Sequence, residues 1–100
     1  MSKNDIWHLY IIQCADNTLY TGITLDLERR FAEHNSNGVK CAKYLRGRQP
    51  LTMIYHNAII GKSAALKAEI KVKKLARVKK LWLAQGRLTI EELMPETHDS

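Results

Sequence analysis

The first half of the chain alternates between short apolar runs and clusters of turn residues. Residues 6–14 (IWHLYIIQC) are nearly all apolar or β-forming, residues 19–24 form a shorter run of the same kind, and residues 51–60 form a third. Runs of this length that are bounded by turn residues are typical of strands, and the first is apolar enough to be covered on both faces. The pattern therefore predicts three strands.

The first two strands are separated only by residues 15–17 (Ala-Asp-Asn). A three-residue hairpin loop needs a left-handed backbone at its last position, which Asn tolerates better than most residues. We therefore expect a hairpin whose loop is closed by Cys14 and Thr18.

This loop fixes the pairing of the two strands. Tyr10 should lie opposite Gly22, and Tyr20 opposite Ile12, so that both phenols share one face because side chains alternate along a strand. A two-residue loop would place the two phenols on opposite faces.

Helical periodicity follows the hairpin. Residues 25–36 have Thr24 or Asp26 available as the N-cap, and Asn37-Gly38 provides a stop. The spacing places four residues on one helix face: Leu27, Arg30, Phe31 and His34.

The second half predicts further helices. Residues 37–50 form a basic loop with at most one helical turn, and Ser63 is a candidate N-cap for a helix that reaches at least Leu75. Residues 78–85 form another helical stretch, and residues 89–93 a last turn. Together with the strands this predicts an α+β fold, a small antiparallel sheet with helices packed beside it.

Composition limits the organisation and the partners. A chain of 100 residues with 45% hydrophobic residues suits one domain, which we place over residues 1–100. The net charge of +6 favours a polyanionic partner. The positive charge is concentrated in residues 62–80, which hold eight Lys or Arg and one acid. The tail over residues 88–100 is acidic.

Targeting signals and cysteine motifs are absent from the sequence. No run has the length of a membrane span or the form of a signal peptide, so we expect a cytoplasmic protein. Cys14 and Cys41 lack the spacing of a zinc site and are expected to be buried free thiols.

The helix after Ser63 carries one unusual acid. Its lysines gather on one face, whereas Ala65, Ile70 and Val72 take the opposite arc, and Glu69 sits within that apolar arc. A carboxylate there must be paired or must coordinate a metal ion. A salt bridge to Lys73 at i+4 is the simpler alternative.

Other residues could join Glu69 in phosphodiester hydrolysis. A metal ion on the carboxylate could polarise the phosphoryl group, Arg30 could bind the developing charge, and a phenolate could take a proton from water, with neutral His34 as a proton acceptor. Each has a structural alternative: Tyr10 and Tyr20 could be packing residues, and Arg30 could pair with Asp26.

Two groups of cations could track a phosphate backbone. The basic loop places its cations around an aromatic ring that would be free to stack on a base, and these residues are Lys40, Lys43, Tyr44, Arg46 and Arg48. On the later helix, Lys67, Lys71 and Lys74 could extend the same track. A solvated lysine face that only keeps the protein soluble is the alternative.

These residues resemble the GIY-YIG nuclease superfamily, most closely its small one-domain bacterial members. The resemblance rests on "HLY" at residues 8–10, "YTG" at residues 20–22, and the downstream segments "ITLDLERRFAEHN", "KYLRGRQPLTMIYH" and "ALKAEIKVKKL". It covers about residues 6–82 and implies a three-stranded antiparallel sheet flanked by helices.

The resemblance also implies roles. Tyr10 and Tyr20 match the motif tyrosines that supply the general base and its hydrogen-bonding partner, and Gly22 matches the glycine that permits close approach. Arg30 matches the arginine on the scissile phosphate, His34 a residue that assists proton transfer, and Glu69 the single carboxylate that holds one Mg²⁺ or Mn²⁺ ion.

The expected function is therefore that of a metal-dependent endonuclease acting on DNA, with branched, nicked or damaged DNA selected by shape or through a protein partner. The alternative is a nucleic-acid-binding module that keeps the fold without turnover. A basic RNA-associated protein is a third possibility that rests on charge alone.

Overall fold

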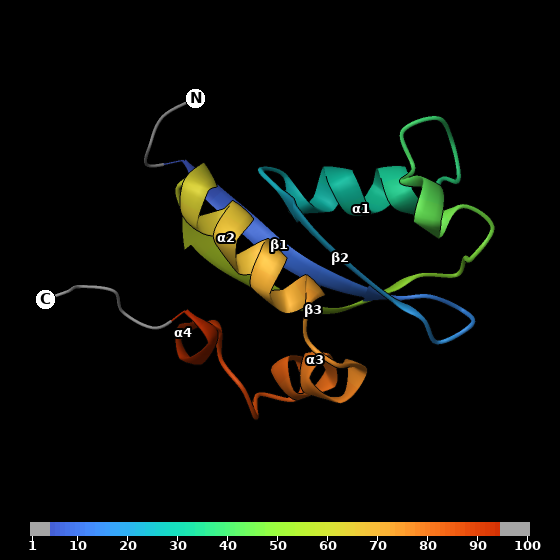
Figure 1. The fold of residues 1–100 in the computed structure, drawn as a ribbon. Coiled ribbons are helices and arrows are strands. Elements are labelled where there is room, and N and C mark those ends of the chain that lie inside the picture. The colour runs from blue at the N-terminus through green and yellow to red at the C-terminus, as the bar shows by residue number, and fades with distance from the viewer. Residues whose placement is uncertain (1–4, 95–100) are drawn as a thin grey trace, which may run out of the picture.

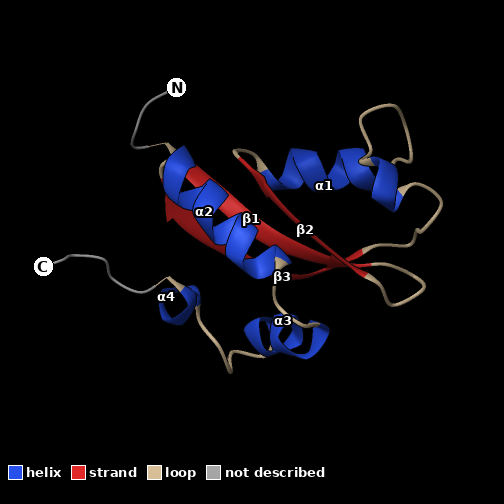
Figure 2. Ribbon diagram, viewed as in Figure 1, coloured by secondary structure: helices blue, strands red, loops and turns tan. Residues whose placement is uncertain are grey.

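The computed structural model describes residues 5–94, which form a three-stranded sheet with helices packed around it (Figures 1 and 2). The strands are β1 (Ile6–Gln13), β2 (Leu19–Thr24) and β3 (Thr52–Ile60). Their order is β2-β1-β3, and both neighbouring pairs are antiparallel. The α+β class and the antiparallel sheet are therefore confirmed.

The β1–β2 hairpin has the predicted loop. The backbone N–H of Cys14 donates to the Thr18 carbonyl at 2.9 Å, and Asn17 has the left-handed φ of 69° that the three-residue loop requires.

The predicted register of the hairpin is also confirmed. Tyr10 pairs with Gly22 and Ile12 pairs with Tyr20, which places the two phenols on the same face of the sheet.

Helical segments occupy the remaining predicted positions, with small shifts at their ends. They are α1 (Leu27–Asn35), the short 3₁₀ helix η1 (Lys43–Leu45), α2 (Lys62–Lys73), α3 (Arg77–Ala84) and α4 (Ile90–Leu93). Of the two N-cap candidates for α1, Asp26 is the one used, since its carboxylate accepts a hydrogen bond from the Arg29 N–H at 3.1 Å.

The ends of α2 differ from the prediction. Its N-cap is Gly61 and not Ser63, because the chain leaves β3 with a φ of 92° that glycine adopts without strain. The helix ends at Lys73 instead of reaching Leu75. The N–H of Leu75 turns back to the carbonyl of Val72, and the extended backbone of Ala76 stops the helix there.

The two faces of β1 enter two different apolar clusters. Leu9 and Ile11 pack against α2, α3 and α4, in a cluster that also contains Ala68, Val72, Leu83 and Ile90. Tyr10 and Ile12 point the other way, into a cluster with Cys14, Cys41, Leu45 and Leu51. Figure 1 shows α2 lying along β1, with α3 and α4 on the same side.

The buried face of α2 is narrower than the sequence predicts. Ala65, Ala68 and Val72 are buried, whereas Ile70 is 53% exposed, contrary to its predicted place on the buried arc. The contact with the sheet is made by these three small residues, and Ile70 lies outside it.

The start of the acidic tail is folded. Residues 90–93 form α4 behind a capping box of Thr89 and Glu92, and Ile90 is buried in the core. Glu96 and Asp99 lie outside the described residues. No helix in the described range 5–94 is long and apolar enough to cross a membrane.

Candidate active site

Three aromatic residues from three elements meet on the α1 face of the sheet. Tyr10 of β1 and Tyr20 of β2 have ring centroids 6.3 Å apart. His34 of α1 lies 5.9 Å from the Tyr10 centroid and 5.5 Å from that of Tyr20. The β1–β2 register and the inward face of α1 together produce this cluster.

His34 is fully buried and has a partner at each ring nitrogen. Its Nε2 lies 2.8 Å from the Tyr10 Oη, and its Nδ1 accepts a hydrogen bond from the backbone N–H of Ala42 at 3.3 Å. Burial, followed by the charge of Arg30, lowers the pKa of His34 to about 4. The imidazole is therefore neutral at physiological pH.

The Tyr10 phenol is only 2% exposed, and its surroundings favour the protonated form. Burial raises the pKa of Tyr10, the neighbouring Tyr20 raises it further, and the charge of Arg30 lowers it only in part. Tyr10 can serve as a base only if hydrogen-bond donors or added positive charge stabilise its phenolate.

Gly22 makes room for that phenol. A Cβ added at Gly22 would lie 2.5 Å from the Tyr10 Oη and 2.7 Å from its Cζ, closer than van der Waals contact permits. The hydroxyl of Tyr10 therefore lies directly over the backbone of β2, where only glycine fits.

Arg30 contacts the loop after α1 and carries its charge beside Tyr10. It donates to the Glu33 carboxylate at 2.8 Å and to the Lys40 carbonyl at 2.7 Å, and its side chain is 29% exposed. The alternative in which Arg30 forms an ion pair with Asp26 is wrong, since the Asp26 carboxylate lies near the guanidinium of Arg29 instead. Burial acts to lower the pKa of Arg30, but the Glu33 hydrogen bond and the nearby Tyr10 raise it overall.

Glu69 on α2 makes the salt bridge that the sequence offered as an alternative. Its carboxylate lies 3.3 Å from the Lys73 Nζ, and its side chain is 17% exposed. The charge of Glu69 also contributes to raising the pKa of Tyr10, so the carboxylate acts on the aromatic cluster although it belongs to another helix. Glu69 therefore makes the predicted salt bridge, and its charge is the smallest of the influences on the pKa of Tyr10.

Glu69 offers a divalent ion a single carboxylate on α2. Within residues 5–94, no group of three or more His, Cys, Asp or Glu side chains could hold a metal ion. A hard cation such as Mg²⁺ needs only one or two protein carboxylates and completes its shell with water and substrate phosphate. The single carboxylate of Glu69, whose side chain is 17% exposed, fits that requirement and does not fit a zinc site.

Tyr44 and Arg48 have partners within the fold, and both side chains remain partly exposed. The Tyr44 ring stacks on Tyr20 with centroids 5.9 Å apart, and the Arg48 guanidinium lies 4.5 Å from the Tyr44 centroid. Arg48 also pairs with Asp16 in the hairpin loop at 2.6 Å. These contacts join segments that are distant in sequence and hold Tyr20 in place, while the binding of a nucleic acid by Tyr44 and Arg48 stays a prediction.

The other predicted phosphate contacts remain on the surface. Lys40, Lys43, Lys67 and Lys71 are exposed. Arg46 is exposed too, although one of its N–H groups donates to the Val39 carbonyl at 3.2 Å. The lysines are therefore available to a polyanion.

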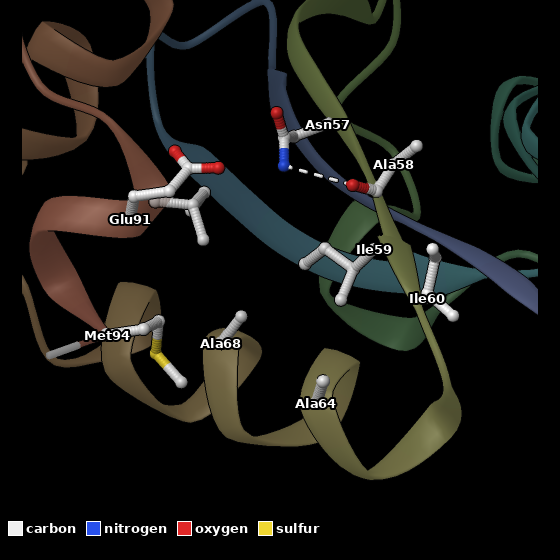
Figure 3. Close-up of a pocket in the computed structure, with 9 residues that line it drawn as sticks. Asn57, Ala58, Ile59, Ile60, Ala64, Ala68, Glu91 and Met94 are labelled. Carbon is white, nitrogen blue, oxygen red and sulfur yellow. Dashed lines mark hydrogen bonds between the residues drawn. The ribbon is translucent and has the colours of Figure 1, made fainter. Parts of the chain in front are cut away.

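A cavity of about 480 Å³ lies elsewhere, between β3, α2 and α4 (Figure 3). Its lining is mostly apolar and includes Ile59, Ala64, Ala68 and Met94. None of the predicted catalytic residues lines it. The cluster of Tyr10, Tyr20 and His34 therefore lies at the α1 face and not in this cavity.

Sequence reasoning missed several partners in the site. Glu33 could have been predicted as the ion-pair partner of Arg30, because it follows Arg30 at i+3 on the same helix. The sequence indicated Asp16 only as a turn residue and not as the ion-pair partner of Arg48. The backbone N–H of Ala42 leaves no mark in a sequence, since every residue except proline carries one.

Comparison with known proteins gives a consistent family assignment. The GIY-YIG catalytic domain family matches residues 6–81. A UPF0213 protein of Cronobacter sakazakii is 45% identical over 87% of this chain and 90% of its own length. A UPF0213 protein of Cupriavidus necator is 46% identical over 80% of this chain and 85% of its own length.

Two solution NMR structures have the same fold. The UPF0213 protein from Bacillus halodurans superposes with a TM-score of 0.53 at 35% identity, over 95% of this chain and 99% of that one. A protein from E. faecalis gives a TM-score of 0.57 at 31% identity, over 100% and 99% of the two chains. By both sequence and fold, the chain belongs to the GIY-YIG superfamily, among its small single-domain UPF0213 members.

Proposed function

We propose that the protein is a metal-dependent endonuclease that hydrolyses phosphodiester bonds of DNA at branched, nicked or damaged structures, in a repair-related role. The observation that carries this proposal is the convergence of Tyr10, Tyr20 and His34 at one point of the sheet, with the charges of Arg30 and Glu69 acting on Tyr10. This set combines a proton-transfer group, a cation for phosphate and a carboxylate for a metal ion.

Substrate binding falls to the exposed lysines. Lys40 and Lys43 lie in the loop that contacts α1, and Lys67 and Lys71 lie on the helix that carries Glu69. Such contacts bind the phosphate backbone without reading bases, and they weaken as salt is added. Substrate choice then depends on DNA shape or on a protein partner.

In the proposed reaction, four side chains each have one role: Tyr10, Tyr20, Arg30 and Glu69. The Tyr10 phenolate takes a proton from the attacking water, whose oxygen bonds to phosphorus as the bond to the leaving oxygen breaks. Arg30 stabilises the charge that develops on the phosphoryl oxygens, and Tyr20 helps to hold Tyr10 in position. Glu69 would hold the Mg²⁺ or Mn²⁺ ion. When bound, the ion would polarise the phosphoryl group and stabilise the negative charge on the leaving oxygen.

A nucleic-acid-binding module without turnover is the second candidate. It is favoured by the 3.3 Å salt bridge between Lys73 and Glu69, which competes with metal binding, and by the raised pKa of Tyr10. In that case the basic surface alone would be functional.

The test is incubation of the purified protein with structured and plain duplex DNA, and with matched RNA, in Mg²⁺ or Mn²⁺. We expect the wild type to cleave structured DNA and Glu69→Ala to lose that cleavage. Glu28→Ala, which removes an exposed carboxylate from α1, serves as the matched control and should cleave like the wild type. If the wild type binds DNA in a salt-dependent manner without cleaving it, or if Glu69→Ala cleaves equally well, the enzyme proposal fails.

A further inference from the structure

The contact between His34 and Ala42 determines which way a proton can move in the aromatic cluster. A backbone N–H is always a hydrogen-bond donor, so the nitrogen that faces it must be a bare acceptor. The Ala42 N–H faces the Nδ1 of His34 at 3.3 Å. A hydrogen on Nδ1 would place two donors against each other inside a fully buried site.

One neutral form of the imidazole satisfies this contact. With Nδ1 bare, the single ring hydrogen of neutral His34 must be on Nε2, which lies 2.8 Å from the Tyr10 Oη. Nε2 is then a donor, and the Tyr10 oxygen is the acceptor. Taking a proton from Tyr10 would require a bare Nε2, which exists only in the tautomer that the Ala42 N–H opposes.

We propose that His34 is a positioning residue that donates its Nε2–H to Tyr10 and stabilises the Tyr10 phenolate, and that it does not accept the Tyr10 proton. This replaces the proton-acceptor role predicted from the sequence. The catalytic consequence rests on the proposed nuclease function, whereas the direction of the hydrogen bond rests on the geometry alone.

The loop that carries Ala42 is held on α1 by further hydrogen bonds. Arg30 donates to the Lys40 carbonyl at 2.7 Å, and the Gln49 side chain donates to the His34 carbonyl at 2.9 Å. Ala42 itself is the N-cap of η1. The amide that selects the His34 tautomer is therefore fixed by the same helix that carries His34.

The orientation also directs the hydroxyl hydrogen of Tyr10. Because the oxygen accepts from His34 on one side, its own O–H must point away from the imidazole. That hydrogen is then available to a water molecule or a phosphate oxygen. When Tyr10 is ionised, the His34 donor and the Arg30 charge are the two groups that stabilise the phenolate.

The direct test is the ¹⁵N spectrum of the His34 ring in the full chain at neutral pH. The nitrogen that carries the hydrogen resonates far upfield of the bare nitrogen, so the tautomer is read without any activity measurement. We expect a bare Nδ1 and a protonated Nε2. A protonated Nδ1, or an imidazolium at neutral pH, would overturn the proposal.

Two substitutions of Ala42 test whether its amide selects the tautomer. Ala42→Pro removes the N–H at a residue whose φ of −59° already suits proline, and Ala42→Gly keeps the N–H. We expect a hydrogen to appear on Nδ1 in a fraction of the Ala42→Pro molecules and the wild-type spectrum in Ala42→Gly. An unchanged spectrum in folded Ala42→Pro would contradict the assigned cause.

The catalytic consequence is tested with His34→Gln and His34→Phe under saturating DNA. A Gln amide can donate to Tyr10 but cannot take its proton, whereas Phe can do neither. We expect Phe to lower kcat by about 100-fold or more, and Gln to stay within about tenfold of the wild type. If Gln loses as much as Phe while both variants remain folded, His34 acts as a proton acceptor and the proposal fails.

These tests separate the two proposals. If the wild type has no nuclease activity, the proposed function fails, yet the ¹⁵N spectrum still decides which nitrogen of His34 carries the hydrogen.

Discussion

Neighbouring residues of β1 have opposite surroundings on the two faces of the sheet. Leu9 and Ile11, both 0% exposed, enter a cluster whose buried members are all aliphatic. Tyr10, between them in the sequence, is 2% exposed and is hydrogen-bonded to the fully buried His34. One strand therefore supplies the core with one set of side chains and the candidate site with the other.

Buried polar side chains are treated differently on the two faces: Tyr10 and His34 are hydrogen-bonded to each other, whereas Thr21, which pairs with Ile11 on the α2 face, is 4% exposed and its Oγ1 has no hydrogen-bond partner among the described residues. A buried polar side chain loses its hydration and needs a hydrogen bond in return, so it stabilises a fold less than an apolar residue of similar size. The α2 face holds the structure by apolar packing. The α1 face gives up part of that stability to hold Tyr10 and His34 in a defined geometry.

The largest expected effect concerns stability on the α2 face. Ile11→Ala removes a fully buried side chain from the core cluster and should lower the free energy of unfolding by about 2 to 5 kcal/mol. Chemical denaturation measures it, with Val78→Ala at a 53% exposed position as the control, which should change little. A loss equal to that of the control would mean that this face does not hold the fold.

At Arg30, on the α1 face, a substitution should change activity more than stability. Arg30→Lys keeps the charge but loses the planar guanidinium, and we expect cleavage to fall about 100-fold or more with little change in stability. Arg29→Lys, on the neighbouring residue whose side chain is 65% exposed, is the matched control and should cleave like the wild type. Equal rates for the two variants would remove Arg30 from the chemistry.

The buried His34 should make the free energy of unfolding depend on pH in the acid range. Its pKa in the folded chain is about 4, below the ordinary value of 6.5, so between these pH values only the unfolded chain binds that proton. The free energy of unfolding should therefore fall as pH drops from 6.5 to 4, by about 3 kcal/mol from this residue. Denaturation of the wild type and of His34→Gln over this window measures it, and parallel pH dependences for both would contradict the assignment.

A smaller effect on both properties is expected at Gly22. The added methyl of Gly22→Ala would lie 2.5 Å from the Tyr10 Oη, so the phenol must move, at a cost of about 1 to 3 kcal/mol in stability and a loss of cleavage. Gly38→Ala is the control, since its nearest contact is the Ser36 Oγ at 3.3 Å. Wild-type activity in Gly22→Ala would show that the position of Tyr10 over β2 is not required.

Local sequence rules were sufficient for the hairpin and for most helix positions. The three-residue loop ending in Asn17 determines the register, and the register places Tyr10 and Tyr20 on the same face. The α1 periodicity likewise turns His34 toward the sheet. Each of these steps depends on neighbours within a few residues in sequence, which is where pattern rules apply.

Contacts between distant segments were not predictable in the same way. The stacking of Tyr44 between Tyr20 and Arg48 joins residues from the loop and β2. The tautomer of His34 depends on a backbone amide eight positions away. The sequence could place the candidate site residues on their strands and helices, but the partner that orients each of them depends on tertiary packing.

The central claim is that the aromatic cluster on the α1 face of the sheet carries the proton transfer of phosphodiester hydrolysis, whereas the apolar cluster on the α2 face only holds the fold. The same substitution can be made on both faces, since Tyr55 on β3 pairs with Ile11 and packs against the α2-face cluster. The most direct measurement is single-turnover cleavage of structured DNA with Mg²⁺ by Tyr10→Phe and Tyr55→Phe. We predict that Tyr10→Phe loses about 100-fold or more while Tyr55→Phe keeps the wild-type rate; equal rates for the two variants would contradict the claim.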